Sequence, residues 1–234
     1  MNTCTYGDSS DPLELLVIAP HPDDAEIGCG GTLLVAAGQG KRTGVLELTR
    51  GELGTLGSPE VRDAEALEAA KILGLAYRGN LRWPDGGVTD TPAYRLELAA
   101  VIRQLRPRVL LAPHETDRHP DHVGAALVTL SAVHFAALKN APLIGDPHRV
   151  TQVLHYQGNA AINANVLVDV SGVVDDWQRA VMAHASQFTG IEVSTTVSPL
   201  VLERRRARML YWGALAGVGM AEAFESYQPL LWQH

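Results

Sequence analysis

The chain has 234 residues, 46% of them hydrophobic, and a formal net charge of −7. This composition supplies enough apolar side chains for a filled core and excludes an intrinsically disordered protein. The acidic balance argues against binding to nucleic acid, which needs clustered Lys and Arg. No segment has the long uncharged run of a membrane helix or the pattern of a basic, apolar leader, so we expect no membrane association. Because its two cysteines, Cys4 and Cys29, do not suggest a disulfide framework, we expect a cytoplasmic protein.

Apolar runs alternate with helix-compatible segments along the first part of the chain. The runs at 15–19, 43–48, 77–83 and 109–112 predict strands, and the segments at 25–38, 61–73, 93–105 and 120–138 predict helices. Pro59 and Pro120 stand where helices can begin, because a proline in the first helical turn loses no hydrogen bond. Strands that alternate with helices are typical of a parallel sheet with crossover connections.

The second part continues this pattern. Strands are predicted at 150–156 and 166–170, and helices at 174–188 and 200–215. No linker, repeat or low-complexity tract divides the chain. We therefore predict an α/β fold, a Rossmann-like and mostly parallel sheet with helices on both faces. It would form a single domain over residues 13–234, after a flexible tail at 1–12.

A first polar cluster follows the strand at 15–19 directly and contains His21, Asp23 and Asp24. Ligands of parallel α/β sheets bind beyond the carboxyl ends of the strands, where this cluster would lie. His21 and Asp24, three residues apart in a tight turn, can point to one place while Asp23 points elsewhere. Taken alone, the same residues also fit a structural role in which His21 caps the next helix and the acids favour its dipole.

A second cluster follows the strand at 109–112 and strengthens the functional interpretation. His119 and His122 are again three residues apart beside a helix start, with Asp117 and Asp121 next to them. Imidazole and carboxylate groups are ligands of divalent metals such as zinc. Two such clusters at strand ends predict that they converge on one ion.

Other chemistries remain open at this point. A metal-dependent phosphoesterase also uses His/Asp clusters, although such enzymes often hold two ions and the chain offers few further ligands. A nucleotide-binding module is suggested by Gly28, Gly30 and Gly31, but these are not in G-x-G-x-x-G order. Cys29 is a rival nucleophile at a helix start, although a small buried cysteine is more common there.

Three motifs resemble those of a known family: His21-Pro-Asp-Asp24, Thr49-Arg-Gly-Glu52 and Arg118-His-Pro-Asp-His122. They are similar to motifs of the LmbE/PIG-L superfamily of zinc-dependent N-acetylglucosaminyl deacetylases. The closer resemblance is to the bacillithiol-biosynthesis branch, which removes acetate from N-acetylglucosaminyl malate. That closer resemblance depends on the softer similarity of the segments 50–55, 84–86 and 186–188.

The resemblance implies a metal centre in which His21, Asp24 and His122 bind one zinc ion per chain, with Fe²⁺ as the alternative in the cell. The remaining coordination positions would stay open, as in catalytic sites. The family also implies a small amino-sugar substrate and a homo-oligomer.

The resemblance also implies catalytic roles. Asp23 would be the general base that takes a proton from the attacking water. His119 would stabilise the tetrahedral oxyanion or protonate the departing amine, and Asp121 would hold the His119 ring in the useful tautomer. The substrate would contact a further set of residues: Arg50, Glu52, Asp85, Arg118, His184 and Gln187.

Overall fold

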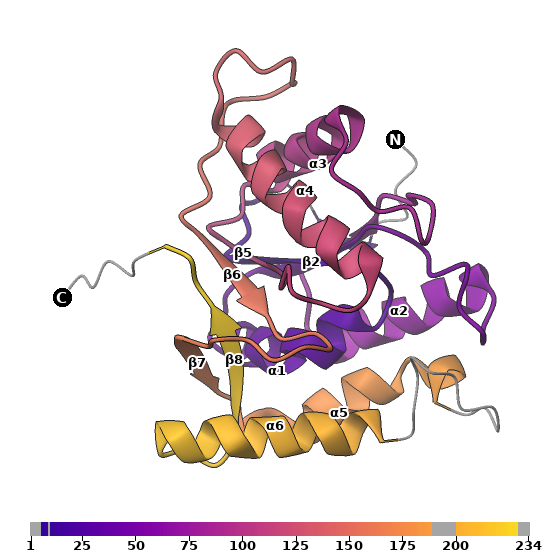
Figure 1. The fold of residues 1–234 in the computed structure, drawn as a ribbon, viewed down its shortest axis with the longest axis vertical. Coiled ribbons are helices and arrows are strands. Elements are labelled where there is room, and N and C mark those ends of the chain that lie inside the picture. Colours follow the sequence, from indigo (N-terminus) through magenta and orange to yellow (C-terminus); the bar gives the residue numbers. More distant parts are fainter. Residues whose placement is uncertain (1–5, 9, 189–199, 229–234) are drawn as a thin grey trace.

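The computed structural model describes residues 6–8, 10–188 and 200–228, whose strands form one eight-stranded sheet in the order β1-β4-β3-β2-β5-β6-β8-β7 (Figure 1). The strands are β1 (Tyr6–Gly7), β2 (Leu15–Ala19), β3 (Thr43–Glu47), β4 (Tyr77–Asn80), β5 (Val109–Pro113), β6 (Gln152–Tyr156), β7 (Val166–Asp169) and β8 (Ala221–Glu225). The helices are α1 (Asp24–Gly38), α2 (Pro59–Leu73), α3 (Pro92–Leu105), α4 (Pro120–Ala137), α5 (Val174–Met182) and α6 (Val201–Ala216).

The central part of the sheet is parallel. β2 pairs in parallel with β3 on one side and with β5 on the other, and β4 and β6 extend the parallel order outward. β1 and β8 run antiparallel to their neighbours. The prediction of a mostly parallel α/β sheet is therefore confirmed, and the carboxyl ends of β2 and β5 lie side by side at one edge.

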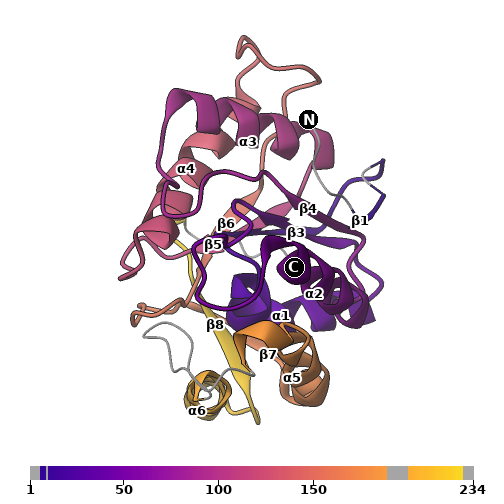
Figure 2. The same cartoon turned by 90° about the vertical axis from the view of Figure 1, so that its right-hand side faces the viewer.

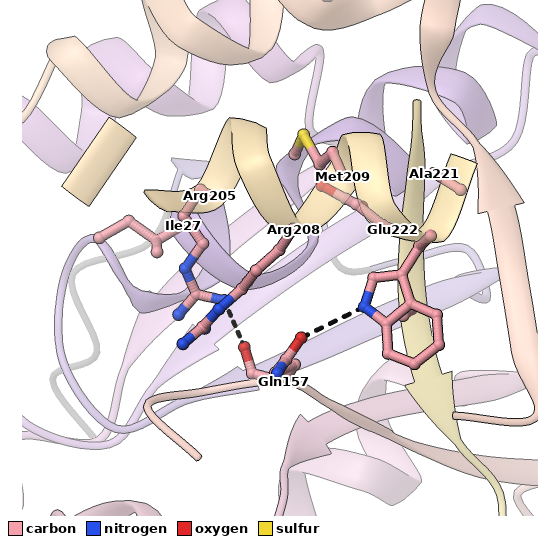
Figure 3. Close-up of a pocket in the computed structure, with 10 residues that line it drawn as sticks. Ile27, Gln157, Arg205, Arg208, Met209, Ala221 and Glu222 are labelled. Atoms are coloured by element: carbon pink, nitrogen blue, oxygen red, sulfur yellow. Dashed lines mark hydrogen bonds between the residues drawn. The ribbon is translucent and has the colours of Figure 1, made fainter. Parts of the chain in front are cut away.

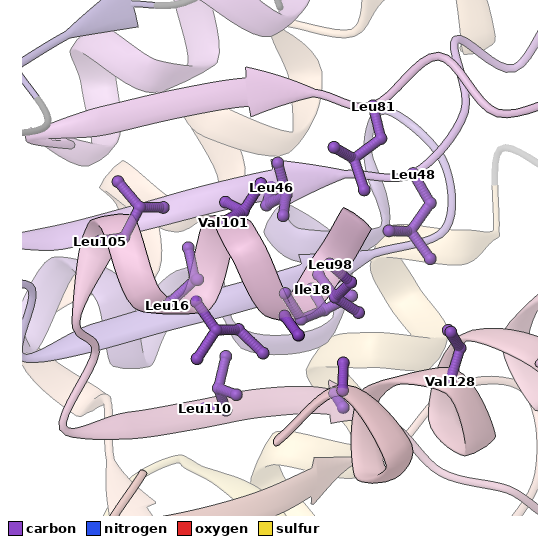
Figure 4. Packing of buried hydrophobic residues seen from close by; sticks show 14 of the residues in the cluster. Leu16, Ile18, Leu46, Leu48, Leu81, Leu98, Val101, Leu105, Leu110 and Val128 are labelled. Atoms are coloured by element: carbon purple, nitrogen blue, oxygen red, sulfur yellow. The ribbon is translucent and has the colours of Figure 1, made fainter. Parts of the chain in front are cut away.

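Helices cover both faces of the sheet (Figure 1, Figure 2). Successive residues of a strand point to opposite faces, so Leu16 and Ile18 pack with α3 and α4, whereas Val17 packs with α1 and α2. Figure 4 shows the first of these clusters, in which Leu98 of α3 lies among the strand leucines. The helices α5 and α6 form a further layer beyond α1, joined to it by a small cluster around Trp177.

Helix starts follow the predicted signals. Ser58 caps α2 by accepting the Val61 N–H, with Pro59 in the first turn. The main chain of His119 stands at the N-cap of α4 and Pro120 follows it, as expected.

Several boundaries differ from the sequence prediction. β8 was not predicted, because its sequence, Ala-Glu-Ala-Phe-Glu, favours a helix and becomes a strand only through pairing with β6 and β7. The helix predicted over 174–188 ends at Met182, and a short 3-10 turn at Ala185–Gln187 follows. Tyr6 and Gly7 pair with β4, so the expected flexible tail at 1–12 is wrong for these two residues. Residues 1–5, with Cys4, and residue 9 lie outside the described residues.

No helix in the described part of the chain combines the length and the apolar character needed to cross a bilayer.

Candidate metal centre

The turn between β2 and α1 carries the first cluster. It reverses so sharply that Asp24 is already the first residue of α1. Asp23 has φ of 99°, a backbone conformation that is strained for a residue with a side chain and that is found mostly where function or packing imposes it. The N-cap of α1 is Asp23, whose side chain makes no capping hydrogen bond, so the alternative in which His21 caps this helix is not supported.

The carboxylate of Asp24 joins the two clusters. Its Oδ2 lies 3.1 Å from Nδ1 of His21 and 3.3 Å from Nε2 of His122. In tetrahedral zinc sites with bonds near 2.1 Å, ligand atoms are about 3.4 Å apart. The two distances therefore fit two edges of such a coordination shell, and the three side chains are only partly exposed to solvent.

The second ring nitrogen of His21 faces two carboxylates. Nε2 lies 3.1 Å from Oδ1 of Asp85 and 3.1 Å from Oδ2 of Asp121. Each carboxylate is itself held by main-chain N–H groups, Asp85 by Leu53 and Asp121 by Gly86 and Val88. Histidines that bind metals usually donate their other N–H to such an acceptor, which fixes the ring.

The second ring nitrogen of His122 likewise faces a carboxylate. Its Nδ1 lies 3.3 Å from Oδ2 of Asp117, a buried side chain that also accepts the N–H groups of His119 and Asn159. These contacts outweigh burial and hold the pKa of Asp117 below its usual value. The sequence places Asp117 in the second cluster but indicates no role for it, because its contacts with His122 and with the distant Asn159 arise only from the fold.

The imidazole rings of His21, His119 and His122 gather at one point, with ring centroids 4.8 to 5.7 Å apart. In the described residues, two groups of three have ligand atoms within 4.8 Å of one another: these three histidines, and His21 with Asp85 and Asp121. The predicted convergence of the two clusters is therefore present, and the arrangement could hold a metal ion.

The prediction that the Asp121 carboxylate holds the His119 ring is wrong. That carboxylate faces His21 and the main chain of residues 86–88, and it is the main-chain N–H of Asp121 that donates to Nδ1 of His119, at 3.3 Å. An Nδ1 that accepts this hydrogen bond carries no proton, so the neutral ring has its proton on Nε2. The backbone at the start of α4 thus selects the tautomer of the neutral His119 ring.

Asp23 lies next to the metal-ligand candidates without contacting them as Asp24 does. Burial raises the pKa of Asp23 to about 6, the positive charge of Arg62 opposes this rise, and the charge of Asp24 adds to it. Arg62 was not singled out from the sequence, because an arginine in the middle of an amphipathic helix is normally a solvated residue.

Among the expected substrate contacts, Arg50 is already paired. Its guanidinium donates to Asp63, with one bond of 2.6 Å, and to Glu60, both on α2. Glu52 accepts the main-chain N–H of Asp85 and so links the loop after β3 to the loop after β4. Both residues support the loops around the site.

The other expected contacts divide into one exposed and two buried residues. Arg118 is exposed and directly precedes His119 in the chain, and its side chain pairs with no carboxylate in the described part of the chain. His184 is fully buried, 3.3 Å from Glu26 in a network that includes Arg78. Gln187 is also buried and donates to the carbonyl of Leu56. Of these three residues, only Arg118 is exposed to solvent.

The glycines of α1 are explained by packing. A Cβ at Gly28 would lie 2.6 Å from Tyr156, one at Gly30 would lie 3.0 Å from Trp177, and one at Gly31 would meet Val170. Cys29 is buried, and burial raises the pKa of its thiol well above the usual value. These observations favour neither a phosphate-binding turn nor a cysteine nucleophile.

A small pocket lies between α6, β8 and the residue after β6, Gln157 (Figure 3). Its arginines, Arg205 and Arg208, point toward the loop after β6 and donate to the carbonyls of Gln157 and Gly158. A Cβ at Gly158 would overlap Oδ2 of Asp117. The arginines thus fix the loop that presses against the Asp117 carboxylate.

Comparison with known proteins agrees with this site. Residues 16–133 match the PIG-L family, described as GlcNAc-PI de-N-acetylase. Diacetylchitobiose deacetylase of Thermococcus kodakarensis is 33% identical, over 96% of this chain and 86% of that protein. The 1D-myo-inositol 2-acetamido-2-deoxy-alpha-D-glucopyranoside deacetylase of Rhodococcus erythropolis is 30% identical, over 75% of this chain and 81% of its own length. The crystal structure of the conserved protein TT1542 from Thermus thermophilus has a TM-score of 0.89 and 51% identity, over 94% of this chain and 97% of that one.

Together, the sheet, the histidine–carboxylate cluster and these relatives define the chain as an amide hydrolase of the deacetylase type. It belongs to the PIG-L family, since the family match covers half of its length and the similarity to a curated relative covers nearly all of it. The resemblance expected from the three motifs is confirmed.

Proposed function

We propose that this chain removes the N-acetyl group from an N-acetylglucosaminyl glycoside in a zinc-dependent reaction, with N-acetylglucosaminyl malate as the substrate. The observation that carries the proposal is the double contact of Asp24 with His21 and His122 at ligand-like distances. His21, Asp24 and His122 would hold the ion. Bound there, zinc would polarise the acetamide carbonyl and lower the pKa of a water molecule to about 7.

The protein groups then have distinct tasks. Asp23 takes the proton of the water that attacks the acetamide carbon, because it is the carboxylate of the turn that is not committed to both histidines. His119 points its protonated Nε2 away from the backbone contact at Nδ1 and can donate to the oxygen that becomes negative. The C–N bond then breaks, and the proton held by Asp23 passes to the departing amine.

The loop residues around the ion support a preorganised site. Asp85 and Asp121 hold His21 from its far side, and Asp117 holds His122. Such outer contacts orient metal ligands and raise their basicity. The proposed ligands therefore need little rearrangement to bind a cation.

The proposed substrate class depends on Arg118. Arg118 is exposed and directly precedes His119, so we expect its guanidinium to be available to a carboxylate, which Arg binds in bidentate fashion. A malyl aglycone carries carboxylates, whereas the aglycones of diacetylchitobiose and of the inositol glycoside carry none. An acidic protein needs such a local cation to retain an anionic ligand.

The experiment that tests this function measures amine release from N-acetylglucosaminyl malate, diacetylchitobiose and free N-acetylglucosamine. Each is assayed before chelation, after chelation and after zinc is returned. We expect the malate glycoside to have the highest kcat/KM, with loss on chelation and recovery with zinc. Rates that ignore chelation would contradict the metal-dependent mechanism, and a preference for diacetylchitobiose would contradict the anionic aglycone while leaving the deacetylase reaction intact.

A further inference from the structure

A buried arginine of α2, Arg62, lies behind the first cluster and makes no ion pair within the described residues. Its side chain is almost fully buried, and its guanidinium donates to two main-chain carbonyls, Nη2 to Pro22 at 2.7 Å and Nη1 to Gly51 at 2.8 Å. Burying a guanidinium without a carboxylate partner costs free energy. The two carbonyl hydrogen bonds are the interactions that offset this cost within the described residues.

The two carbonyls belong to the two segments that support His21 and Asp23. Pro22 lies between these residues in the turn after β2. Gly51 begins the loop in which the Leu53 N–H donates to one oxygen of Asp85, whose other oxygen contacts His21. One guanidinium therefore ties the strained turn to the loop that orients the same histidine from its far side.

The loop after β3 packs closely against the Arg62 guanidinium. Gly51 has φ of +67°, and a Cβ there would overlap Nη1 of Arg62. A Cβ at Gly54 would lie 2.9 Å from the same nitrogen. Glycine at these two positions lets the main chain approach the cation closely enough to surround it.

We propose that Arg62 is a positioning residue of the deacetylase, whose guanidinium clamps the Pro22 and Gly51 carbonyls and so holds Asp23 and His21 in reactive geometry. The inference rests on the proposed function, because that function assigns Asp23 and His21 their roles. Arg62 acts through these two residues and does not touch the substrate. A displacement of about 1 Å in such groups can cost on the order of 10²-fold in rate.

The chain offers a matched control in Arg103 of α3. This arginine is also buried, and it donates to the carbonyls of Ala136, Leu138, Leu143 and Gly145, none of which belongs to the site. Arg62→Met and Arg103→Met each put an unbranched apolar side chain in place of the arginine. Each removes the guanidinium that donates to the main-chain carbonyls. Arg62→Lys keeps the charge, but one ammonium group cannot reproduce the planar fork.

The experiment measures kcat, KM, zinc content and melting temperature of the zinc-loaded proteins with N-acetylglucosaminyl malate. We expect Arg62→Met to lose on the order of 10²-fold in kcat, with KM and zinc content near those of the parent. Arg62→Lys should recover part of that loss. Arg103→Met should lower the melting temperature and leave kcat unchanged.

Two outcomes would overturn the proposal: parent kcat in Arg62→Met, or a loss of kcat that Arg103→Met reproduces. If Arg62→Met does not fold, Arg62→Lys decides, since a parent kcat in that variant overturns the clamp and a reduced kcat at full zinc content supports it. A failure of the proposed function is seen separately, because the parent protein itself would then release no amine or would ignore chelation.

Discussion

The turn after β2 and the loop after β5 each lead into a helix whose first turn carries a metal-ligand candidate, Asp24 in α1 and His122 in α4, but the two segments are held in different ways. After β2, α1 begins at Asp24, and the strained Asp23 is the only residue of the turn with a positive φ. After β5, residues 114–119 form a loop before α4 begins at Pro120. Within the described residues, Nε2 of His21 faces two carboxylates, whereas Nδ1 of His122 faces only that of Asp117.

The difference shows two ways to preorganise a ligand. The first segment is short, so its own backbone and the Arg62 clamp fix its geometry. The second is longer, and it depends on the loop after β6, where Asn159 donates twice to Asp117. We therefore expect the second segment to be the more sensitive to loss of a single supporting side chain.

The largest effect is expected from His122→Ala, which removes the ligand contributed by the second segment. Zinc content should fall to background together with amine release, because two remaining ligands do not hold a catalytic ion. Zinc analysis and the amine assay measure both. His134→Ala, at the exposed end of the same helix, is the control and should change neither.

Asp23→Asn tests the first segment without breaking its backbone, since asparagine tolerates positive φ. We expect kcat to fall about 10²- to 10⁴-fold, the usual contribution of a general base. Zinc content should remain at the parent level, in contrast to His122→Ala. Turnover at the parent rate would show that another group accepts the proton.

The unequal support of the two histidines is compared directly in Asp117→Asn and Asp85→Asn. Loss of an outer carboxylate typically weakens metal affinity about 10- to 100-fold. Asp117→Asn should reach that range, because Nδ1 of His122 faces no other carboxylate of the described residues, whereas Asp85→Asn should cost less, because Asp121 remains beside Nε2 of His21. Zinc titration against a competing chelator gives both affinities, and equal losses would remove the distinction between the segments.

The smallest effect is expected from Arg50→Ala. The family resemblance implies that Arg50 contacts the substrate, but its pairing with Asp63 predicts an unchanged KM and a stability loss of about 1 kcal/mol or less. Arg118→Ala should instead raise KM for N-acetylglucosaminyl malate and not for diacetylchitobiose. Steady-state kinetics with both substrates separates the two arginines, and a raised KM in Arg50→Ala would return that residue to the pocket.

Much of the site could be predicted because its residues are local in sequence. His21 and Asp24, and likewise His119 and His122, stand three residues apart at the ends of apolar strands. Parallel pairing of β2 and β5 then requires that the two clusters lie at the same edge. The order of strands and helices followed from the short-range periodicity of apolar residues. Two helix starts followed from the prolines at 59 and 120.

The remaining features depend on contacts between distant residues. Periodicity could not find β8, whose residues favour a helix until β6 and β7 pair with them. It also could not show that the Asp121 carboxylate turns to His21 rather than to His119, since both lie within reach of a residue at that position.

The sequence by itself therefore determined the family, the alternation of strands and helices and the metal-ligand candidates, because these are written in residue types at short spacings. Only the tertiary structure decided which carboxylate orients which histidine, that Arg50 is engaged by α2, and that Arg62 bridges two loops. The physical reason is that a side chain's hydrogen-bond partner is selected by the packing of elements far apart in the chain, and no local pattern records that choice.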